Sequence, residues 1–202
     1  NTLLRFPSAS SPAANYGTAI HATLQRAHDH LRSVGSKQPE EDILHEFEKQ
    51  LSKLVFTDTE RKHYSQQGGD ALSKFLDEHY DSFSANQIPE LDFARQNVHI
   101  SEAHLTGKLD VVELNKKSLM ASVVDYKTGS VLTSWDKGDK FKKIKAYKYR
   151  QQLLFYKLLI ENSRDFRKYK MEKGILQFVE PDENGNIVNL SLSTIDDHEL
   201  ER

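Results

Sequence analysis

The sequence predicts an α/β protein in which a mixed central β-sheet is flanked by helices and follows a helical N-terminal section. Up to about residue 89, apolar side chains recur every three or four positions, which is the period of a buried helix face. From about Phe93 the apolar residues gather in short, β-branched runs that are typical of strands. A further helical pattern separates two groups of these runs, and this order is typical of a mixed α/β fold.

The bulk composition of the 202 residues excludes several classes of protein. The formal charge of −2 and pI of about 6.5 give no global cationic signature, so a polyanion would be held by a local patch or through metal ions. The absence of cysteine excludes disulfides, thiolate zinc sites and iron–sulfur clusters within this chain. No apolar run approaches the roughly 20 residues of a membrane span and no signal peptide is present, so we expect no membrane and a cytoplasmic location by default.

Residues that typically start or end helices predict the first elements of the chain. Residues 1–15 are rich in Ser, Ala and Pro, which predicts a linker or a strand-like lead-in. The chain begins at Asn1 rather than Met, so we expect a fragment of a longer chain. The first helix should start near residues 16–18 and end at Gly35, and a second helix should follow Pro39.

The third helical stretch opens with a capping box. Thr57 is followed three residues later by Glu60, which is a helix N-terminus signature. The pair Gly68-Gly69 weakens this stretch midway, so the pattern leaves open whether it is one interrupted helix or two. Pro89 is expected to close the helical section.

The α/β section should occupy residues 90–202. Its strands are expected at Val98–Ile100 and in two arms of a hairpin, and a second hairpin should turn at Asn184-Gly185. In chain order, the remaining expected elements are a strand over 106–114, a strand over 119–126, a helix over 143–162, a strand over 174–180 and a strand over 187–192.

The first hairpin carries an acid on each arm. If it closes between Leu114 and Leu119, Asp110 lies opposite Val123, and the period of two places Asp125 on the same face. A shift of one residue would move Asp110 to the other face. Two carboxylates about 4 Å apart repel by roughly 4 kcal/mol at an effective dielectric near 20, and a hard divalent cation between them relieves this repulsion. The hairpin therefore predicts a metal site.

Lys127 adds a positively charged group to this site, because its side chain points to the same face as that of Asp125. Mg²⁺ prefers a few carboxylates plus several waters, so Asp110 and Asp125 suit hydrolysis of a phosphodiester by a metal-activated water. Lys127 would position or help deprotonate that water and offset charge on the phosphorus. The alternative is a surface hairpin with an exposed ion pair of little energetic value. Spacing alone leaves both interpretations open.

Four short motifs in a fixed order carry a family resemblance. In chain order they are Gly17-x-x-x-His21, Gly107-x-x-Asp110, Val124-Asp125-Tyr126-Lys127-Thr128-Gly129 and Tyr149-x-x-Gln152-Leu153-x-x-Tyr156. Together they resemble the RecB-type branch of the PD-(D/E)XK nucleases, over about two thirds of the chain. The resemblance implies a restriction-endonuclease-like core over residues 90–202, within a single nuclease domain that spans 16–202.

The resemblance also implies a ligand set. Asp110 and Asp125 would be the carboxylate ligands, the main-chain carbonyl of Tyr126 a further one, and His21 would add an imidazole from the first helix. The implied cofactor is Mg²⁺ or Mn²⁺. From position alone, a lone helical His beside an apolar stripe is more often a structural residue.

The same resemblance implies the catalytic groups. Lys127 would be the catalytic lysine, while Gln152 and Tyr156, one helical turn apart, would face the site and orient the lysine, the water or the phosphate. Related members that carry an iron–sulfur cluster need four cysteines, so this chain would belong to a cluster-free subgroup.

A basic stretch lies between the Asp-x-Lys strand and the Gln-Tyr helix. Residues 137–150 contain seven basic side chains interleaved with aromatic ones, which indicates a strip that meets phosphates and stacks on bases. The alternative is a solvated loop and helix start. The candidate nucleic-acid-binding residues are Lys140, Lys142, Lys143, Lys145, Tyr149 and Arg150.

These observations favour a metal-dependent DNA nuclease. By the resemblance, it would be the nuclease module of a recombination or repair helicase–nuclease, with the helicase domain in the same or an associated chain. One alternative is a catalytically inactive nuclease-like module that binds DNA or a partner protein. Another is a metal-dependent RNase or other phosphoesterase with the same site.

Overall fold

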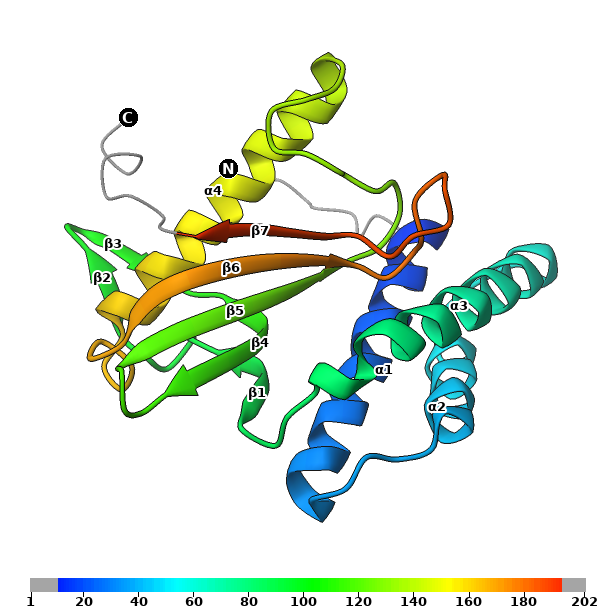
Figure 1. The fold of residues 1–202 in the computed structure, drawn as a ribbon, viewed down its shortest axis with the longest axis horizontal. Helices are drawn as coiled ribbons and strands as arrows, with labels where there is room; N and C mark the ends of the chain where they lie inside the picture. Colours follow the sequence, from blue (N-terminus) through cyan, green and yellow to red (C-terminus); the bar gives the residue numbers. More distant parts are fainter. Residues whose placement is uncertain (1–10, 194–202) are drawn as a thin grey trace, which may run out of the picture.

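A computed structural model describes residues 11–193 as a five-stranded sheet with helices on both faces (Figure 1). The predicted α/β class with a mixed, helix-flanked sheet is confirmed. In chain order the elements are α1 (Pro12–Val34), α2 (Glu40–Ser52), α3 (Asp58–His79), the short 3-10 helix η1 (Tyr80–Ser82), β1 (Gln87–Asp92), β2 (Val98–Ile100), β3 (Ala103–Leu105), β4 (Lys108–Asn115), β5 (Met120–Lys127), α4 (Lys140–Asn162), β6 (Lys170–Phe178) and β7 (Asn189–Ser193).

The sheet is mixed because one of its connections is a helical crossover. Its strand order is β1-β4-β5-β6-β7, in which β5 and β6 run parallel and the other neighbours run antiparallel. Parallel neighbours need a long crossover, and α4 supplies it. The predicted second hairpin is confirmed as β6–β7, and Gly185 in its turn has a φ of 81°. The strands β2 and β3 form a separate two-stranded sheet.

The first helix begins earlier than predicted. The side chain of Ser11 accepts a hydrogen bond from the N–H of Ala14, and Pro12 occupies the first helical position. This combination is a helix start, so reading Pro12–Asn15 as linker was wrong. Residues 1–10 of the expected linker lie outside the described residues. The predicted end at Gly35 is confirmed, with a φ of 81°.

The third helical stretch is a single helix. The capping box of Thr57 and Glu60 is confirmed at the start of α3, which then runs uninterrupted through Gly68 and Gly69. A Cβ on Gly68 would lie 2.2 Å from the ring of Phe47 on α2. Glycine therefore allows α2 and α3 to approach closely at this point.

The prediction that Pro89 closes the helical section was wrong. Pro89 lies inside β1, which pairs only with β4 and forms an edge of the five-stranded sheet. Proline cannot donate a ladder hydrogen bond, and an edge strand tolerates it because one side of the strand needs no partner.

Two hydrophobic cores lie on opposite faces of this sheet. Helices α1, α2 and α3 pack with Val111, Tyr126 and Val179 on one face. Helix α4 packs with Val112, Val123 and other strand residues on the opposite face. The helices α1 and α4 therefore reach the β4–β5 hairpin from its two sides. None of the helices within residues 11–193 is long and apolar enough to cross a membrane.

Candidate active site

The β4–β5 hairpin closes at a different point from the predicted one. Asn115 pairs with Met120, and the Asn115 side-chain oxygen accepts the N–H groups of Lys117 and Ser118 at 3.0 and 3.1 Å. Leu119 completes the turn with a φ of 56°. The side-chain hydrogen bonds of Asn115 hold this loop, which contains no glycine.

This closure moves the register by two residues. The predicted pairing of Asp110 with Val123 was wrong, because Val123 pairs with Val112. Continuing this register along the ladder places Asp125 level with Asp110 on the neighbouring strand. An even shift does not exchange the two faces of a strand, so the two acids stay on one side as predicted.

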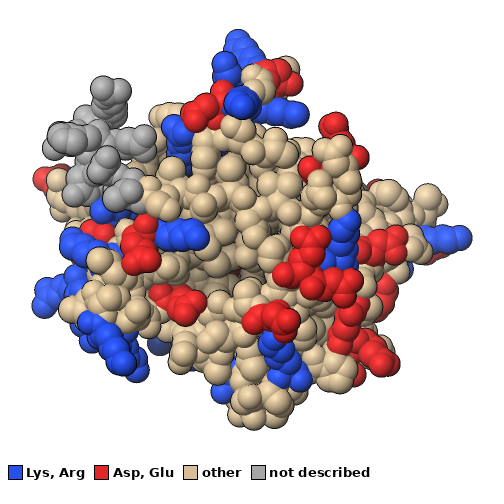
Figure 2. Space-filling view, in the orientation of Figure 1, with Lys and Arg blue, Asp and Glu red and all other residues tan. Residues whose placement is uncertain are grey.

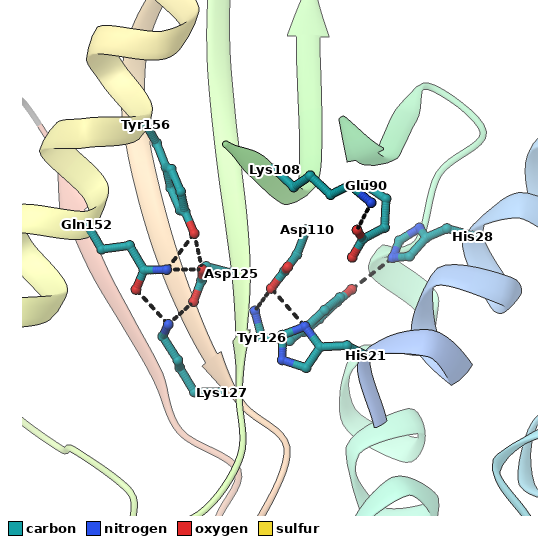
Figure 3. Close-up of polar contacts among 10 residues, drawn as sticks. All are labelled: His21, His28, Glu90, Lys108, Asp110, Asp125, Tyr126, Lys127, Gln152 and Tyr156. Atoms are coloured by element: carbon teal, nitrogen blue, oxygen red, sulfur yellow. Dashed lines mark hydrogen bonds and ion pairs between the residues drawn. The ribbon is translucent and has the colours of Figure 1, made fainter. Parts of the chain in front are cut away.

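Asp125 lies at the centre of a buried polar network (Figure 3). It is only 2% exposed, and the ammonium nitrogen of Lys127 lies 2.5 Å from its Oδ2. Two groups from α4 hold Oδ1: the hydroxyl of Tyr156 donates at 2.6 Å and the amide of Gln152 donates at 3.0 Å. Lys127 also donates to the Gln152 side-chain oxygen at 2.7 Å. The structure therefore brings Lys127, Gln152 and Tyr156 together around Asp125.

Burial and charge perturb the groups of this network. Burial is the largest effect on Asp125 and raises its pKa. Lys127 lowers this pKa and the charge of Asp110 raises it, and the result remains above the usual value. Burial and then the charge of Asp125 raise the pKa of Tyr156, so its hydroxyl keeps its proton and donates. The ring of Tyr149 lies 4.6 Å from the Lys127 nitrogen, and burial raises the pKa of Tyr149 to about 12.

The hydrogen-bonding and charged partners of Asp110 come from β5 and α1. Its Oδ2 accepts the main-chain N–H of Tyr126 at 2.8 Å and lies 3.3 Å from Nδ1 of His21 on α1. Burial alone would lower the pKa of His21, but the hydrogen bond and charge of Asp110, with the charge of Asp125, raise it. Tyr126 follows Asp125 in the chain, and its hydroxyl pairs with Nε2 of His28 at 2.8 Å in the core.

A glycine allows α1 to bring His21 to this position. A Cβ on Gly17 would lie 2.9 Å from the hydroxyl oxygen of Thr128, just beyond the end of β5. The motif Gly17-x-x-x-His21 thus combines a close-approach position with a polar side chain one turn further along the same helix face.

Glu90 is a candidate metal ligand that the sequence interpretation missed. Ligand atoms of His21, Glu90 and Asp110 all lie within 4.8 Å of one another, and no other such His or acidic trio occurs in the described part of the chain. Asp125 instead turns toward Lys127 and α4. Glu90 follows Pro89 in β1. Because Pro89 was predicted to end the helical section, no strand was predicted at Glu90. The apolar residues around it, Ile88 and Leu91, were the available signal for an edge strand.

The basic stretch forms the start of α4, which projects beyond the sheet (Figure 1). Asp139 caps the helix by accepting the N–H of Lys142 at 2.8 Å. Figure 2 shows Lys and Arg side chains gathered at this projecting end, with acidic side chains beside them. The exposed residues among those predicted to bind nucleic acid are Lys140, Lys142 and Lys143.

The other three predicted nucleic-acid residues are partly buried. Lys145 donates to the Ser130 hydroxyl at 2.8 Å, and the ammonium nitrogens of Lys127 and Lys145 lie 4.6 and 5.5 Å from the centre of the Tyr149 ring. Arg150 pairs with Asp136 at 2.9 Å. Tyr149 and Lys145 therefore join the exposed lysines to the Asp125 network.

A family model described as the PD-(D/E)XK nuclease superfamily matches residues 2–200. The chain belongs to the PD-(D/E)XK nuclease superfamily. Its mixed sheet with flanking helices is consistent with the restriction-endonuclease-like fold that the resemblance implied. No curated protein matches the chain.

PD-(D/E)XK nucleases use divalent metal ions, and the donors in this PD-(D/E)XK chain fit such an ion. Carboxylate oxygens of Glu90 and Asp110 are the hard ligands that Mg²⁺ and Mn²⁺ prefer, and an imidazole such as His21 is compatible with Mn²⁺ and similar ions. The buried carboxylate of Asp125 is balanced here by Lys127, which shows that the site tolerates a cation beside it.

Proposed function

We propose that this PD-(D/E)XK protein is a deoxyribonuclease of the RecB-type branch that hydrolyses phosphodiester bonds with Mg²⁺ or Mn²⁺. One observation carries the proposal: Asp110 and Asp125 lie level on adjacent strands, with the Lys127 ammonium beside one and the His21 imidazole beside the other. Acid, acid, lysine and histidine are the groups that the family resemblance implies.

In this proposal His21, Asp110, Asp125 and the main-chain carbonyl of Tyr126 are the cation ligands. A bound divalent cation would polarise a phosphoryl oxygen and lower the pKa of a water molecule. The N–H of Tyr126 holds one oxygen of Asp110, which fixes the direction of the other. The His21 imidazole, with its raised pKa, gives up its proton to act as a ligand, so binding should weaken as the pH falls.

Lys127 is the proposed catalytic residue. Its ammonium group would donate to the attacking water or to a phosphate oxygen and offset the negative charge that develops there. Gln152 and Tyr156 are positioning residues, because Gln152 holds Lys127 and both hold Asp125. Tyr149 packs against Lys127 and limits its exposure; the lysine side chain is 14% exposed.

The projecting start of α4 is the proposed path for DNA. Exposed lysines there would meet phosphates, while the half-buried Lys145 and Tyr149 lie between them and Lys127. Arg150, held by Asp136, would contact DNA at the edge of this strip. The strip thus leads from solvent to the catalytic lysine. Its exposed lysines are Lys140, Lys142 and Lys143.

The biological setting is proposed by resemblance. The four RecB-type motifs favour the nuclease module of a DNA recombination or repair helicase–nuclease, with a helicase domain in the same or an associated chain and a cytoplasmic location. A family match over residues 2–200 supports one nuclease domain across the helical section and the sheet, as proposed for 16–202.

A catalytically inactive module that binds DNA or a partner protein is the second candidate. It would bind DNA without divalent metal and leave it uncut. The intact set of Asp110, Asp125 and Lys127 favours the active enzyme.

The test is incubation with 5′- and 3′-labelled single- and double-stranded DNA, and with RNA, in Mg²⁺, Mn²⁺ or EDTA. Wild-type protein should cut DNA only with metal, and Asp125→Ala and Lys127→Ala should each lower the rate by about 10²–10⁴-fold. Asp77→Ala on α3 and Lys53→Ala just after the end of α2 change exposed residues outside the proposed site; they are the matched controls and should cut like wild type. Cleavage that survives EDTA and both site substitutions would refute the proposal, and cleavage of RNA alone would change the substrate.

A further inference from the structure

An open groove, here called the α1 groove, lies beside the proposed cation site. Its volume is about 440 Å³, within the range of about 300–1,000 Å³ that ligand sites usually occupy. The groove adjoins the cation site because His21 belongs to both. Its lining residues are Gly17, Thr18, His21, Ala22 and Gln25 of α1, with Glu90 of β1.

One face of α1 forms most of this groove. Positions 17, 21 and 25 are four residues apart, as are positions 18 and 22, so the five residues share a face of the helix. The fully buried Ile20 and Leu24 lie on another face and pack in the core. Gly17 has no side chain and Ala22 has only a methyl group, so the groove stays open between them.

The charge of the α1 groove differs from that of the basic strip on α4. No lysine or arginine lines the groove, and its one acid, Glu90, is 23% exposed and pairs with Lys108 at 3.6 Å (Figure 3). Phosphates are held by lysine and arginine, which the start of α4 supplies. The groove therefore suits the uncharged part of a nucleotide better than its phosphate.

Gln25 gives the groove a hydrogen-bonding group. It is half-buried, and its side-chain amide makes no hydrogen bond to any other residue in the described range 11–193. The nearby Thr18 hydroxyl donates to the carbonyl of Ala14 at 3.0 Å, so its oxygen can only accept from a ligand. A free amide presents a donor beside an acceptor, which is the pattern that pairs with the edge of a nucleobase.

We propose that the α1 groove holds the base of the nucleotide next to the scissile phosphate, and that the Gln25 amide pairs with the edge of this base. His21 keeps its proposed role as a cation ligand, and Ala22 leaves the space that the base occupies. This inference rests on the proposed function and deepens it. The strip on α4 contacts phosphates, whereas the groove on α1 contacts a base.

The test compares two fluorescent single-stranded oligodeoxynucleotides of equal length and charge, one intact and one without bases. Their affinities are measured by anisotropy in Mg²⁺ with the whole chain carrying Lys127→Ala, which slows cleavage. Added Gln25→Ala should weaken the intact oligonucleotide by roughly 5- to 100-fold, the value of an amide paired with a base edge, and leave the abasic one within about twofold. Lys142→Ala should weaken both equally, because it removes a phosphate contact. Gln66→Ala, an exposed glutamine on α3, is the matched control and should change neither affinity.

Ala22→Leu tests the same groove by filling it. Leucine is a good helix former, so α1 should be retained while the added side chain occupies the space for the base. The intact oligonucleotide should lose affinity by a factor similar to that of Gln25→Ala, and the abasic one should not. An unchanged affinity for the intact oligonucleotide in either variant, or an equal loss for both oligonucleotides, would overturn the inference.

The outcomes separate this inference from the proposed function, because binding and cleavage are measured on different proteins. Metal-dependent cleavage of DNA by wild type, with Gln25→Ala binding as tightly as its parent, would overturn the base site and leave the nuclease in place. A base-dependent loss of affinity in Gln25→Ala, with no cleavage by wild type, would keep the base site and refute the deoxyribonuclease.

Discussion

The hydroxyl of Tyr156 offers a direct measure of the network around Asp125. Tyr156→Phe removes that hydroxyl and keeps the ring, which is 5% exposed in the core between α4 and the sheet. The change deletes the 2.6 Å hydrogen bond to Asp125 and the contact with the Gln152 amide. Because the ring stays, the effect should come from the lost polar contacts alone.

The expected loss of stability follows from the burial of the acceptor. A hydrogen bond to a charged group contributes about 1.5–3 kcal/mol, and Asp125 at 2% exposure is poorly placed to gain water in exchange. We therefore expect the free energy of unfolding to fall by about 2 kcal/mol, which lowers the melting temperature by about 4–8 °C for a chain of this size.

The same substitution should move a titration. The lost bond stabilised the ionised carboxylate, so the already raised pKa of Asp125 should rise further. Cleavage that needs ionised Asp125 should then be lost at a higher pH as the solution is acidified, compared with wild type.

The assay is thermal unfolding by circular dichroism without metal, followed by a pH profile of DNA cleavage. Tyr147→Phe is the matched control, because Tyr147 lies on the same helix and is 63% exposed. Unfolding of Tyr156→Phe within about 0.5 kcal/mol of wild type would refute the energetic argument. An acidic limb that stays in place would refute the link to Asp125.

Three further predictions concern other parts of the chain. Burial lowers the pKa of His28 from 6.5 to about 4, so on acidification His28 takes up a proton in the unfolded chain before it does so in the folded chain. The free energy of unfolding should therefore fall by about 3 kcal/mol between neutral pH and about pH 4. His28→Gln should lack this loss in urea unfolding, and a pH dependence equal to that of wild type would contradict the prediction. Gly68→Ala should destabilise the protein by about 1–3 kcal/mol, because its Cβ would clash with the Phe47 ring. Gly69→Ala should stabilise it by about 0.5–1 kcal/mol, because the space around that Cβ is open. Equal melting temperatures of the two variants would contradict the close packing inferred at Gly68. Alanine at the three exposed lysines of α4 should reduce the slope of log affinity for DNA against log salt by up to about 3, and an unchanged slope would remove that strip from the interface. Those lysines are Lys140, Lys142 and Lys143.

Local signals predicted many boundaries because they act within a few residues. Gly35 ends α1, Thr57 with Glu60 begins α3, and Asn184-Gly185 lies in the turn between β6 and β7. Each of these features depends on backbone conformation or capping that the nearest residues decide. Pro12 was a signal of the same kind, and its preceding Ser11 cap was available in the sequence.

Edge position is decided by the whole sheet, and this is where the sequence interpretation failed. Whether Pro89 ends a structure or sits in a strand depends on how many neighbours that strand has, which no local pattern reports. Because the sequence interpretation did not predict β1, it did not consider Glu90. It did predict that Asp110 and Asp125, on the next two strands of the sheet, share one face.

The hairpin shows why a face is easier to predict than a register. The alternation of apolar residues fixed the side of Asp110 and Asp125, but the side-chain hydrogen bonds of Asn115 decided where the loop closes. The partners of Asp125 lie 27 and 31 residues further along, at Gln152 and Tyr156, and only the family resemblance linked them to it.

The crossover role of α4 has a consequence for biosynthesis. The helix that orients Asp125 and Lys127 is also the connection to β6, and it is held against the sheet by strand residues that include Leu176 of β6. In a ribosome-bound chain that has not yet paired β6 with β5, α4 would not be held against the sheet. Asp125 would then lack the hydrogen bonds from Gln152 and Tyr156. Completion of the proposed active site would thus coincide with completion of the sheet, so an unfinished chain would lack the proposed arrangement of Asp125 and Lys127.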